Sequence, residues 1–190
     1  MAQPAYSRLP VDERRRRLLE ASADLFATHS YDELSMSRIA REAGISKGLL
    51  YHYFPSKREL FVATLQQSAA EIAALTEPDP ELAPMDALAA SLDAFLGWIE
   101  EHPVAYGKLM RSSAQPEVED LIADIRERTA RRILDGLAPG ATPRRRAAVR
   151  GWLWLMDGVI LDWLEHRDME RAEIRDLLLG ALGGAIEASA

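Results

Sequence analysis

The stretch from Ser35 to Leu60 reads SMSRIAREAGISKGLLYHYFPSKREL and decides the fold. It holds two short helical patterns with Gly44 between them, and Pro55 ends the second pattern. Ser35 and Ser46 each precede a helical pattern as N-caps, because a serine hydroxyl accepts a hydrogen bond from a free amide in the first turn of a helix. Glycine adopts a left-handed conformation without a steric penalty, so Gly44 suits the turn. The stretch therefore predicts a helix-turn-helix, with a further helix starting after the proline.

The second helix of this pair has two chemically different faces. Leu50 and Phe54 lie four residues apart and form an apolar face that can pack on the first helix. The opposite face carries a cation, a glycine that exposes the backbone, a phenol and an imidazole, contributed by Lys47, Gly48, Tyr51 and His52. These groups suit the base edges and phosphates of a DNA major groove. The pattern predicts a recognition helix, and Lys57, in the first turn of the next helix, is well placed for a phosphate.

The run A-G-I-S-x-G-x-L-Y-x-Y-F-x-S-K-x-x-L resembles the DNA-binding signature of TetR-type transcriptional regulators. The resemblance extends from about Leu18 to Phe61, and the remainder is similar to the family in length and all-helical pattern. Ser30 stands where such proteins usually have glycine, and Ser35 replaces the commoner threonine. The resemblance implies a homodimer on a near-palindromic double-stranded DNA operator. The residues expected to contact DNA are Ser35, Ser46, Lys47, Gly48, Leu49, Tyr51, His52 and Lys57.

Composition and charge limit the classes of protein. The 190 residues carry a net charge of -7. Residues 1–60 hold 10 Lys+Arg against 8 Asp+Glu, a net of +2, whereas residues 61–190 hold 13 against 22, a net of -9. This asymmetry places the nucleic-acid face in the first third of the chain. The absence of cysteine excludes disulfides and thiolate metal sites. Without a signal peptide or an apolar stretch long enough for a bilayer, we expect a cytoplasmic protein with no membrane partner.

The periodicity predicts an all-α protein of about nine helices, since no strand pattern occurs. We expect residues 1–56 to form the helix-turn-helix DNA-binding domain, which consists of three helices. Residues 57–190 are expected to form an effector-binding and dimerisation domain. The stretch Trp152–Leu164 is apolar on nearly all sides, which predicts burial on more than one side of its helix.

The last predicted helix contains three interior glycines, Gly180, Gly183 and Gly184. Glycine inside a helix costs about 1 kcal/mol relative to alanine, so three of them suggest close approach by a neighbouring helix. In TetR-like proteins the final two helices pair across a two-fold axis, which implies that the neighbour is a second subunit. Packing within one chain is the alternative.

The second domain also contains bulky residues suited to a hydrophobic ligand, namely Trp98, Tyr106, Met110, Trp152 and Met156. Ligand sites are mostly apolar with a few polar groups, although each of these residues could equally belong to the core. Asp157 is the polar candidate for this effector site, and a buried carboxylate needs a partner. The partner is an internal arginine such as Arg111 or Arg150, or a cationic ligand. We expect a mainly apolar or lipophilic cationic effector.

No catalytic or metal-binding pattern is present. The four histidines are scattered over different segments, and no P-loop, dinucleotide fingerprint or nucleophile motif occurs. We therefore expect no enzyme activity, no metal and no cofactor. The sequence predicts a ligand-responsive transcriptional regulator, most simply a repressor released by a small hydrophobic effector, while an activator stays open. The alternative is a small all-α ligand-binding protein or enzyme with a vestigial helix-turn-helix, which leaves the face of Lys47, Tyr51 and His52 unexplained.

Overall fold

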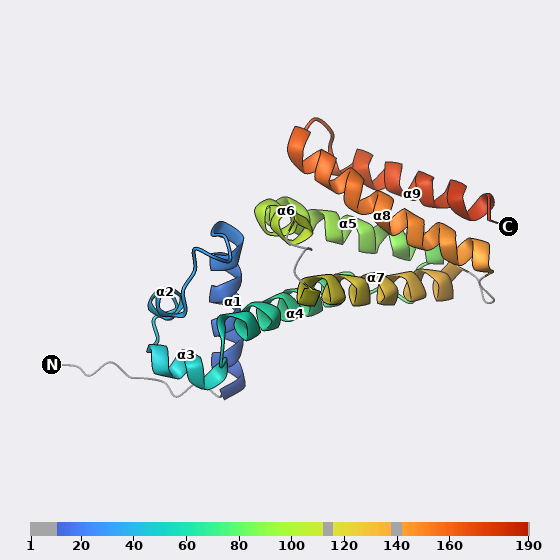
Figure 1. The fold of residues 1–190 in the computed structure, drawn as a ribbon. Helices are drawn as coiled ribbons and strands as arrows, with labels where there is room; N and C mark the ends of the chain where they lie inside the picture. The colour runs from blue at the N-terminus through green and yellow to red at the C-terminus, as the bar shows by residue number, and fades with distance from the viewer. Residues whose placement is uncertain (1–10, 112–115, 138–141, 190) are drawn as a thin grey trace. The chain divides into compact units, whose positions relative to one another are not determined.

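The structure is a computed structural model that describes residues 11–111, 116–137 and 142–189. Within these ranges the chain forms nine α-helices and no strand, which confirms the all-α prediction (Figure 1). The helices are α1 (Val11–Thr28), α2 (Met36–Glu42), α3 (Lys47–Tyr53), α4 (Lys57–Leu75), α5 (Pro84–Glu101), α6 (Pro103–Arg111), α7 (Pro116–Leu137), α8 (Pro143–His166) and α9 (Arg171–Glu187).

The helix-turn-helix formed by α2 and α3 follows from two serines and one glycine. The backbone N–H of Arg38 donates to the Ser35 hydroxyl at 3.2 Å, and that of Leu49 donates to the Ser46 hydroxyl at 3.1 Å. Each serine thus satisfies an amide that has no partner within its helix. Gly44 adopts φ +67°, the left-handed conformation that the turn requires. The predicted caps and turn are confirmed.

A small apolar core joins α1 to α4. Its fully buried members come from all four helices and from the segment between α1 and α2, and they include Leu19, Leu34, Ile39, Leu50 and Leu60. Three aromatic rings contact one another in this unit. The ring of Phe61 in α4 lies 4.8 Å from that of Phe26 in α1 and 5.2 Å from that of Tyr31, measured between centroids. The start of α4 is therefore part of the packing of the first three helices.

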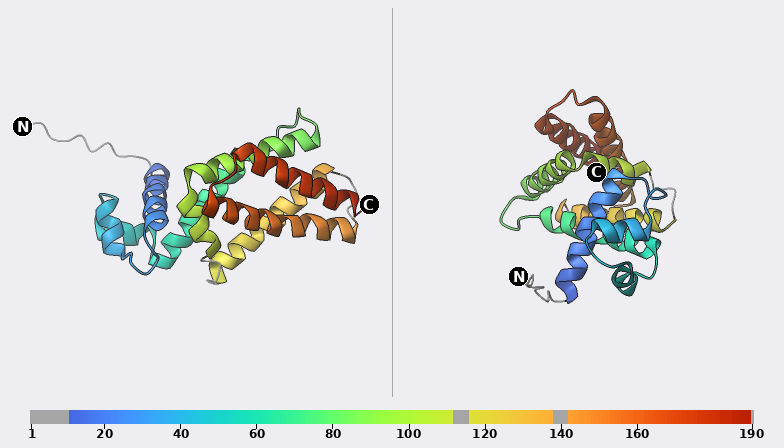
Figure 2. Two further views of the ribbon diagram at one scale, coloured as in Figure 1. Left: turned by 90° about the horizontal axis from the view of Figure 1, so that it is seen from above. Right: turned by 90° about the vertical axis from the view of Figure 1, so that its left-hand side faces the viewer.

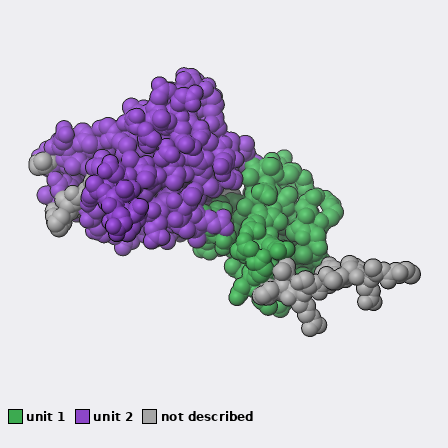
Figure 3. All heavy atoms as spheres, turned by 180° about the vertical axis from the view of Figure 1, so that it is seen from behind, with its two compact units in different colours: residues 1–68 green, residues 69–190 purple. Residues whose placement is uncertain are grey.

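The chain divides into two compact units, Met1–Ser68 and Ala69–Ala190, so the division falls within α4 (Figure 3). Sequence patterns place the boundary between residues 56 and 57, where the proline ends the recognition helix. The difference arises because the buried residues of α4 all lie in its first half, at Leu60, Phe61 and Thr64. These side chains belong to the core of the first unit.

The second unit is a bundle in which α8 and α9 lie side by side (Figures 1 and 2). Both buried tryptophans anchor themselves through the indole N–H, a group that finds a hydrogen-bond partner when buried. Trp152 donates to the Leu178 carbonyl of α9 at 2.8 Å. Trp163 donates to the Met169 carbonyl, just before α9, also at 2.8 Å. These two bonds fix the register of α8 against α9.

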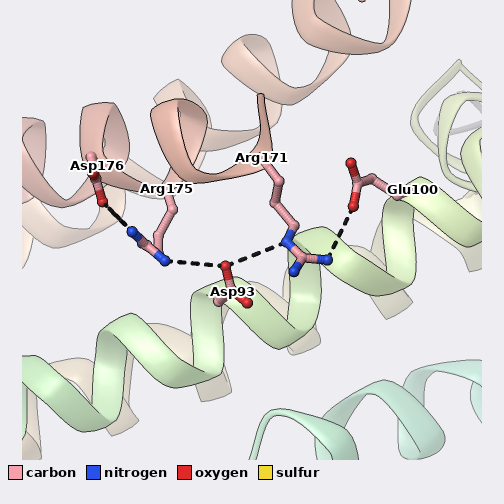
Figure 4. Close-up of polar contacts among 5 residues, drawn as sticks. All are labelled: Asp93, Glu100, Arg171, Arg175 and Asp176. Atoms are coloured by element: carbon pink, nitrogen blue, oxygen red, sulfur yellow. Dashed lines mark hydrogen bonds and ion pairs between the residues drawn. The ribbon is translucent and has the colours of Figure 1, made fainter. Parts of the chain in front are cut away.

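Polar contacts join α5 to α9 (Figure 4). The Asp93 carboxylate lies 3.4 Å from the guanidinium groups of both Arg171 and Arg175, and Arg171 also contacts Glu100 at 3.1 Å. Gly97 makes room for this arrangement, since a Cβ there would lie 3.1 Å from Arg171 Nη1. The groups are partly exposed, so each pair contributes at most about 1 kcal/mol. The contacts orient α9 more than they stabilise it.

The outer side of α8 differs from the prediction. Trp154 is 66% exposed and Leu155 is 45% exposed, although this stretch was expected to be buried on more than one side. Only one face of α8, with Trp152 and Ile160, is buried in the single chain. The sequence shows that a helix is apolar all round, but it does not show whether the chain itself covers every side.

The glycines of α8 and α9 do not serve close packing within the chain. A Cβ at Gly151, Gly158, Gly180, Gly183 or Gly184 would meet no described atom within 4 Å outside its own stretch of helix. Close approach by another described helix of the chain, the alternative for these glycines, therefore does not account for them.

We predict that Gly44→Ala lowers the free energy of unfolding by about 1–2 kcal/mol, because a Cβ is disfavoured at φ +67°. Gly136→Ala is the control, since Gly136 is helical and open space surrounds it. This control should gain roughly 0.5–1 kcal/mol. Urea unfolding of both variants measures the difference, and changes of the same sign would contradict a strained turn.

Candidate DNA-binding and effector sites

The recognition helix α3 presents the predicted face to its surroundings. Lys47, Gly48, Tyr51 and His52 are exposed, whereas Leu50 is fully buried against the rest of the unit. The ammonium of Lys47 lies 5.7 Å from the ring centroid of Tyr51, so the cation stands over the phenol. Of the other residues expected to contact DNA, Ser35 and Ser46 are exposed at the helix starts and Leu49 is half-buried. The geometry leaves the polar side chains of α3 available to a ligand.

Lys57 has a structural partner that the sequence did not reveal. Its Nζ donates to the Tyr31 carbonyl at 2.8 Å and lies 4.1 Å from the centroid of the Tyr31 ring. The ammonium therefore fastens the first turn of α4 to the segment between α1 and α2. An ammonium has three donors, so this contact does not use its full capacity.

In the second unit, two of the predicted effector residues meet. The Tyr106 hydroxyl of α6 donates to Asp157 Oδ1 of α8 at 2.8 Å. Burial, followed by the nearby charge of Asp157, raises the pKa of the Tyr106 phenol far above its usual value. Tyr106 therefore stays neutral and acts as a donor to the carboxylate.

The arginine partner of Asp157 is Arg126 of α7. The prediction of Arg150 was wrong, and the side chain of Arg111 lies outside the described residues. Arg126 Nη2 lies 2.5 Å from Asp157 Oδ2, and Nε donates to the same oxygen at 3.1 Å. Arg150 instead pairs with Glu127 at 2.7 Å, and the side chain of Arg111 falls outside the described part of the structure. The prediction named the right kind of partner. It missed the residue because the register between α7 and α8 decides which arginine faces the carboxylate.

The guanidinium of Arg126 also stacks on an exposed aromatic ring. Its Cζ lies 4.0 Å from the centroid of Trp154. Residues from α6, α7 and α8 thus form one polar joint, which we call the Asp157 joint: Tyr106, Arg126, Trp154 and Asp157. Nothing in the sequence separates Arg126 from the other arginines of its segment, so a pattern of residues could not have identified it.

The remaining effector candidates are placed differently. Trp98, Met110 and Met156 are half-buried and pack against the apolar core of the second unit. Trp152 is buried, and its indole bonds to α9, which indicates a structural role. Among the residues that the structure describes, no group of three His, Cys, Asp or Glu side chains could hold a metal ion. Nor is any helix in those ranges long and apolar enough to span a bilayer.

Two family models match the chain. The model described as "Bacterial regulatory proteins, tetR family" matches residues 18–64, and "Tetracyclin repressor-like, C-terminal domain" matches residues 84–182. The chain belongs to the TetR family. The proteins of this family are DNA-binding transcriptional regulators rather than enzymes, so the helix-turn-helix of this TetR-family chain is its DNA-binding element.

The chain is similar over most of its length to characterised TetR-family regulators. It is 27% identical to the HTH-type transcriptional repressor KstR of Rhodococcus jostii over 180 residues, which are 88% of this chain and 84% of KstR. It is 35% identical to the HTH-type transcriptional activator FasR of Mycolicibacterium smegmatis over 120 residues, which are 59% of this chain and 53% of FasR. The match thus spans only about half the length of FasR.

Solved structures support the same family assignment for the complete fold. The crystal structure of a tetR-family transcriptional regulator from Streptomyces coelicolor superposes with a TM-score of 0.85 at 31% identity, covering 96% of this chain and 84% of that one. The second unit of this TetR-family chain therefore has the helical architecture of solved family members.

The buried part of the Asp157 joint should be energetically coupled. In a double-mutant cycle of Arg126→Ala and Asp157→Ala, we expect a coupling energy of roughly 1–3 kcal/mol, because the bond is charge-assisted and the two side chains are only 24% and 14% exposed. The exposed pair Arg150–Glu127 provides the control cycle, with an expected coupling of 0–1 kcal/mol. Urea unfolding measures both cycles, and equal coupling would contradict a special role for the joint.

Proposed function

We propose that this protein is a homodimeric repressor that leaves its operator when a small, mainly apolar effector binds. The exposed face of α3, with its cation, phenol and imidazole, is the observation that carries the DNA-binding part of the proposal. Repression rather than activation is supported by KstR, a repressor whose match covers 88% of this chain. The match to FasR, an activator, covers 59%. A protein that binds the chromosome of a bacterium would act in the cytoplasm.

Each subunit would place α3 in a major groove, so that the dimer reads a near-palindromic operator. His52 would meet base edges, and Lys47 would meet a phosphate. Ser35 and Ser46 stand at the N-termini of α2 and α3, where the helix dipole favours an anion. Lys57 would lend its remaining donors to the backbone of the DNA. The rival, a ligand-binding protein or enzyme with a vestigial helix-turn-helix, does not explain why these polar groups are exposed together.

A second copy of this chain is the proposed partner of the outer face of α8 and α9. On α8 this face carries Gly151, Leu155 and Gly158, and on α9 it carries Leu177, Gly180 and Gly184, all of them exposed. Small residues beside exposed leucines allow two helix backbones to approach closely while apolar surface is buried. This arrangement supports a four-helix bundle formed by two subunits. We call these six residues the glycine–leucine face.

The effector is proposed to bind beside the half-buried residues Trp98, Met110 and Met156. The sequence alone leaves a lipophilic cation open, because Asp157 could provide its counter-charge. In the structure Arg126 already neutralises Asp157, so we propose an uncharged ligand. Because α4 belongs partly to each unit, a ligand-dependent shift in the second unit would reach the DNA-binding unit through the backbone of α4.

The DNA-binding proposal is tested by two substitutions on α3. His52→Ala should relax base preference at one or two operator positions, whereas Lys47→Ala should weaken binding to all sequences and lower the salt slope by about one. Operator selection at several salt concentrations measures both effects. Lys108→Ala, in α6 of the other unit, removes one lysine charge as a control. Selected operators that His52→Ala leaves unchanged would exclude base reading by the imidazole.

The dimer proposal is tested by Gly184→Leu. Gly184 is exposed and a Cβ there would meet no described atom within 4 Å, so the monomer should stay folded while the dimer dissociates at least tenfold more readily. Gly136→Leu is the matched control, since Gly136 is also helical and open but lies outside the glycine–leucine face. Sedimentation equilibrium gives the dissociation constant, and circular dichroism reports folding. A variant at Gly184 that dimerises like the control would place the interface elsewhere.

A further inference from the structure

The hydroxyl of Ser91, in the middle of α5, differs from every other buried serine and threonine hydroxyl of the described chain. Four of these five hydroxyls donate to a backbone carbonyl three or four residues earlier, at 2.7–2.9 Å; they belong to Ser22, Thr64, Thr76 and Ser189. Ser91 is only 9% exposed, yet its Oγ has no hydrogen-bond partner in the described residues. The carbonyl of Ala87 lies four residues earlier, but the hydroxyl does not bond to it.

A buried hydroxyl without a partner is unfavourable, because folding removes it from water and returns no hydrogen bond. Alanine would fit the same helical position without that cost and with a higher helix propensity. An orphaned polar group of this kind indicates either a structural defect or a partner outside the protein chain, such as an ordered water or a ligand. The position of Ser91 on α5 favours a ligand.

Ser91, Phe95 and Trp98 lie on one face of α5 at the i, i+4 and i+7 positions. The Phe95 ring makes an edge contact with Tyr106, with centroids 6.0 Å apart, and the Tyr106 hydroxyl belongs to the Asp157 joint. Ser91 therefore shares its face of α5 with Trp98, one of the residues proposed to contact the effector. Leu88 and Phe95, its neighbours one turn away on either side, pack against the apolar core.

We propose that Ser91 is a specificity-determining residue of the effector site, and that its hydroxyl donates to an oxygen of an uncharged, mainly apolar ligand. The inference rests on the proposed effector function and names the polar group that such a ligand must carry. A serine hydroxyl both donates and accepts, so a ketone, ester or ether oxygen completes its bonding. A charged group is disfavoured, because Arg126 and Asp157 already neutralise each other.

The test compares two probes that differ at one position. Hexanophenone carries a carbonyl where hexylbenzene carries the benzylic methylene, and both are otherwise the same apolar molecule. Binding of each probe to the full-length wild-type protein and to Ser91→Ala is measured by tryptophan fluorescence titration. We expect Ser91→Ala to reduce the ratio of ketone to hydrocarbon affinity about three- to tenfold, as expected for one neutral hydrogen bond. Ser22→Ala, which removes a hydroxyl that already has a partner, should leave the ratio unchanged.

Two further outcomes separate this inference from the proposed function. If Met156→Trp abolishes binding of both probes while Ser91→Ala leaves their ratio unchanged, the effector site stands and the role of Ser91 is overturned. If neither probe binds the wild-type protein, both the uncharged ligand class and the role of Ser91 are overturned. In that case the exposed groups of α3 still support DNA binding.

Thermal unfolding without probes provides an independent measurement. Ser91→Ala should raise Tm by about 2 °C or more, because it removes an unpaired buried hydroxyl, whereas Ser22→Ala should lower Tm because it removes a satisfied one. A fall in Tm for Ser91→Ala would show that the hydroxyl already has a partner in the free protein. That result would overturn the proposal.

Discussion

The burial of one leucine sets the geometry of the DNA-binding unit. Leu50 is completely enclosed, and because helical side chains repeat every 3.6 residues, its burial turns the side chains of Tyr51 and His52 outward, while Lys47 is exposed at the start of the helix. The left-handed Gly44 allows α2 and α3 to meet at the angle that this contact needs. The recognition surface thus follows from packing, because the burial of Leu50 leaves the polar residues of α3 exposed.

A different constraint governs the second unit, where a carboxylate has to be accommodated among apolar side chains. Asp157 is stabilised there by the Tyr106 hydroxyl and the Arg126 guanidinium, which come from two other helices. This group links α6, α7 and α8, because separating α7 from α8 would leave the partly buried Asp157 without its counter-charge, and separating α6 would remove the hydrogen bond from Tyr106. Within this group the charge of Asp157 is compensated by that of Arg126, so the pair itself is neutral in spite of the acidic composition of the domain.

Features that depend on residues close in sequence could be predicted, and those that depend on long-range register could not. The serine caps and the Gly44 turn involve contacts over three or four residues, so all the interacting residues lie close together in the sequence. The pairing of Asp157 with Arg126 spans 31 residues and depends on how α7 meets α8. The lack of a partner for the Ser91 hydroxyl among the described residues depends on the packing around α5, which no residue pattern encodes. The exposure of Leu155 depends on which sides of α8 the chain itself covers.

The contact between Lys57 and Tyr31 determines where α4 can bend. Its ammonium holds the first turn of α4 to the segment between α1 and α2, and Phe61 is packed between aromatic rings one turn later. The N-terminal half of α4 and the helices α1–α3 are therefore one mechanical body. In the proposed dimer, a motion that separates the two copies of α3 would have to pivot beyond Thr64, the last buried residue of α4. The first half of α4 and the helices α1–α3 would then move as one rigid body, hinged in the second half of α4.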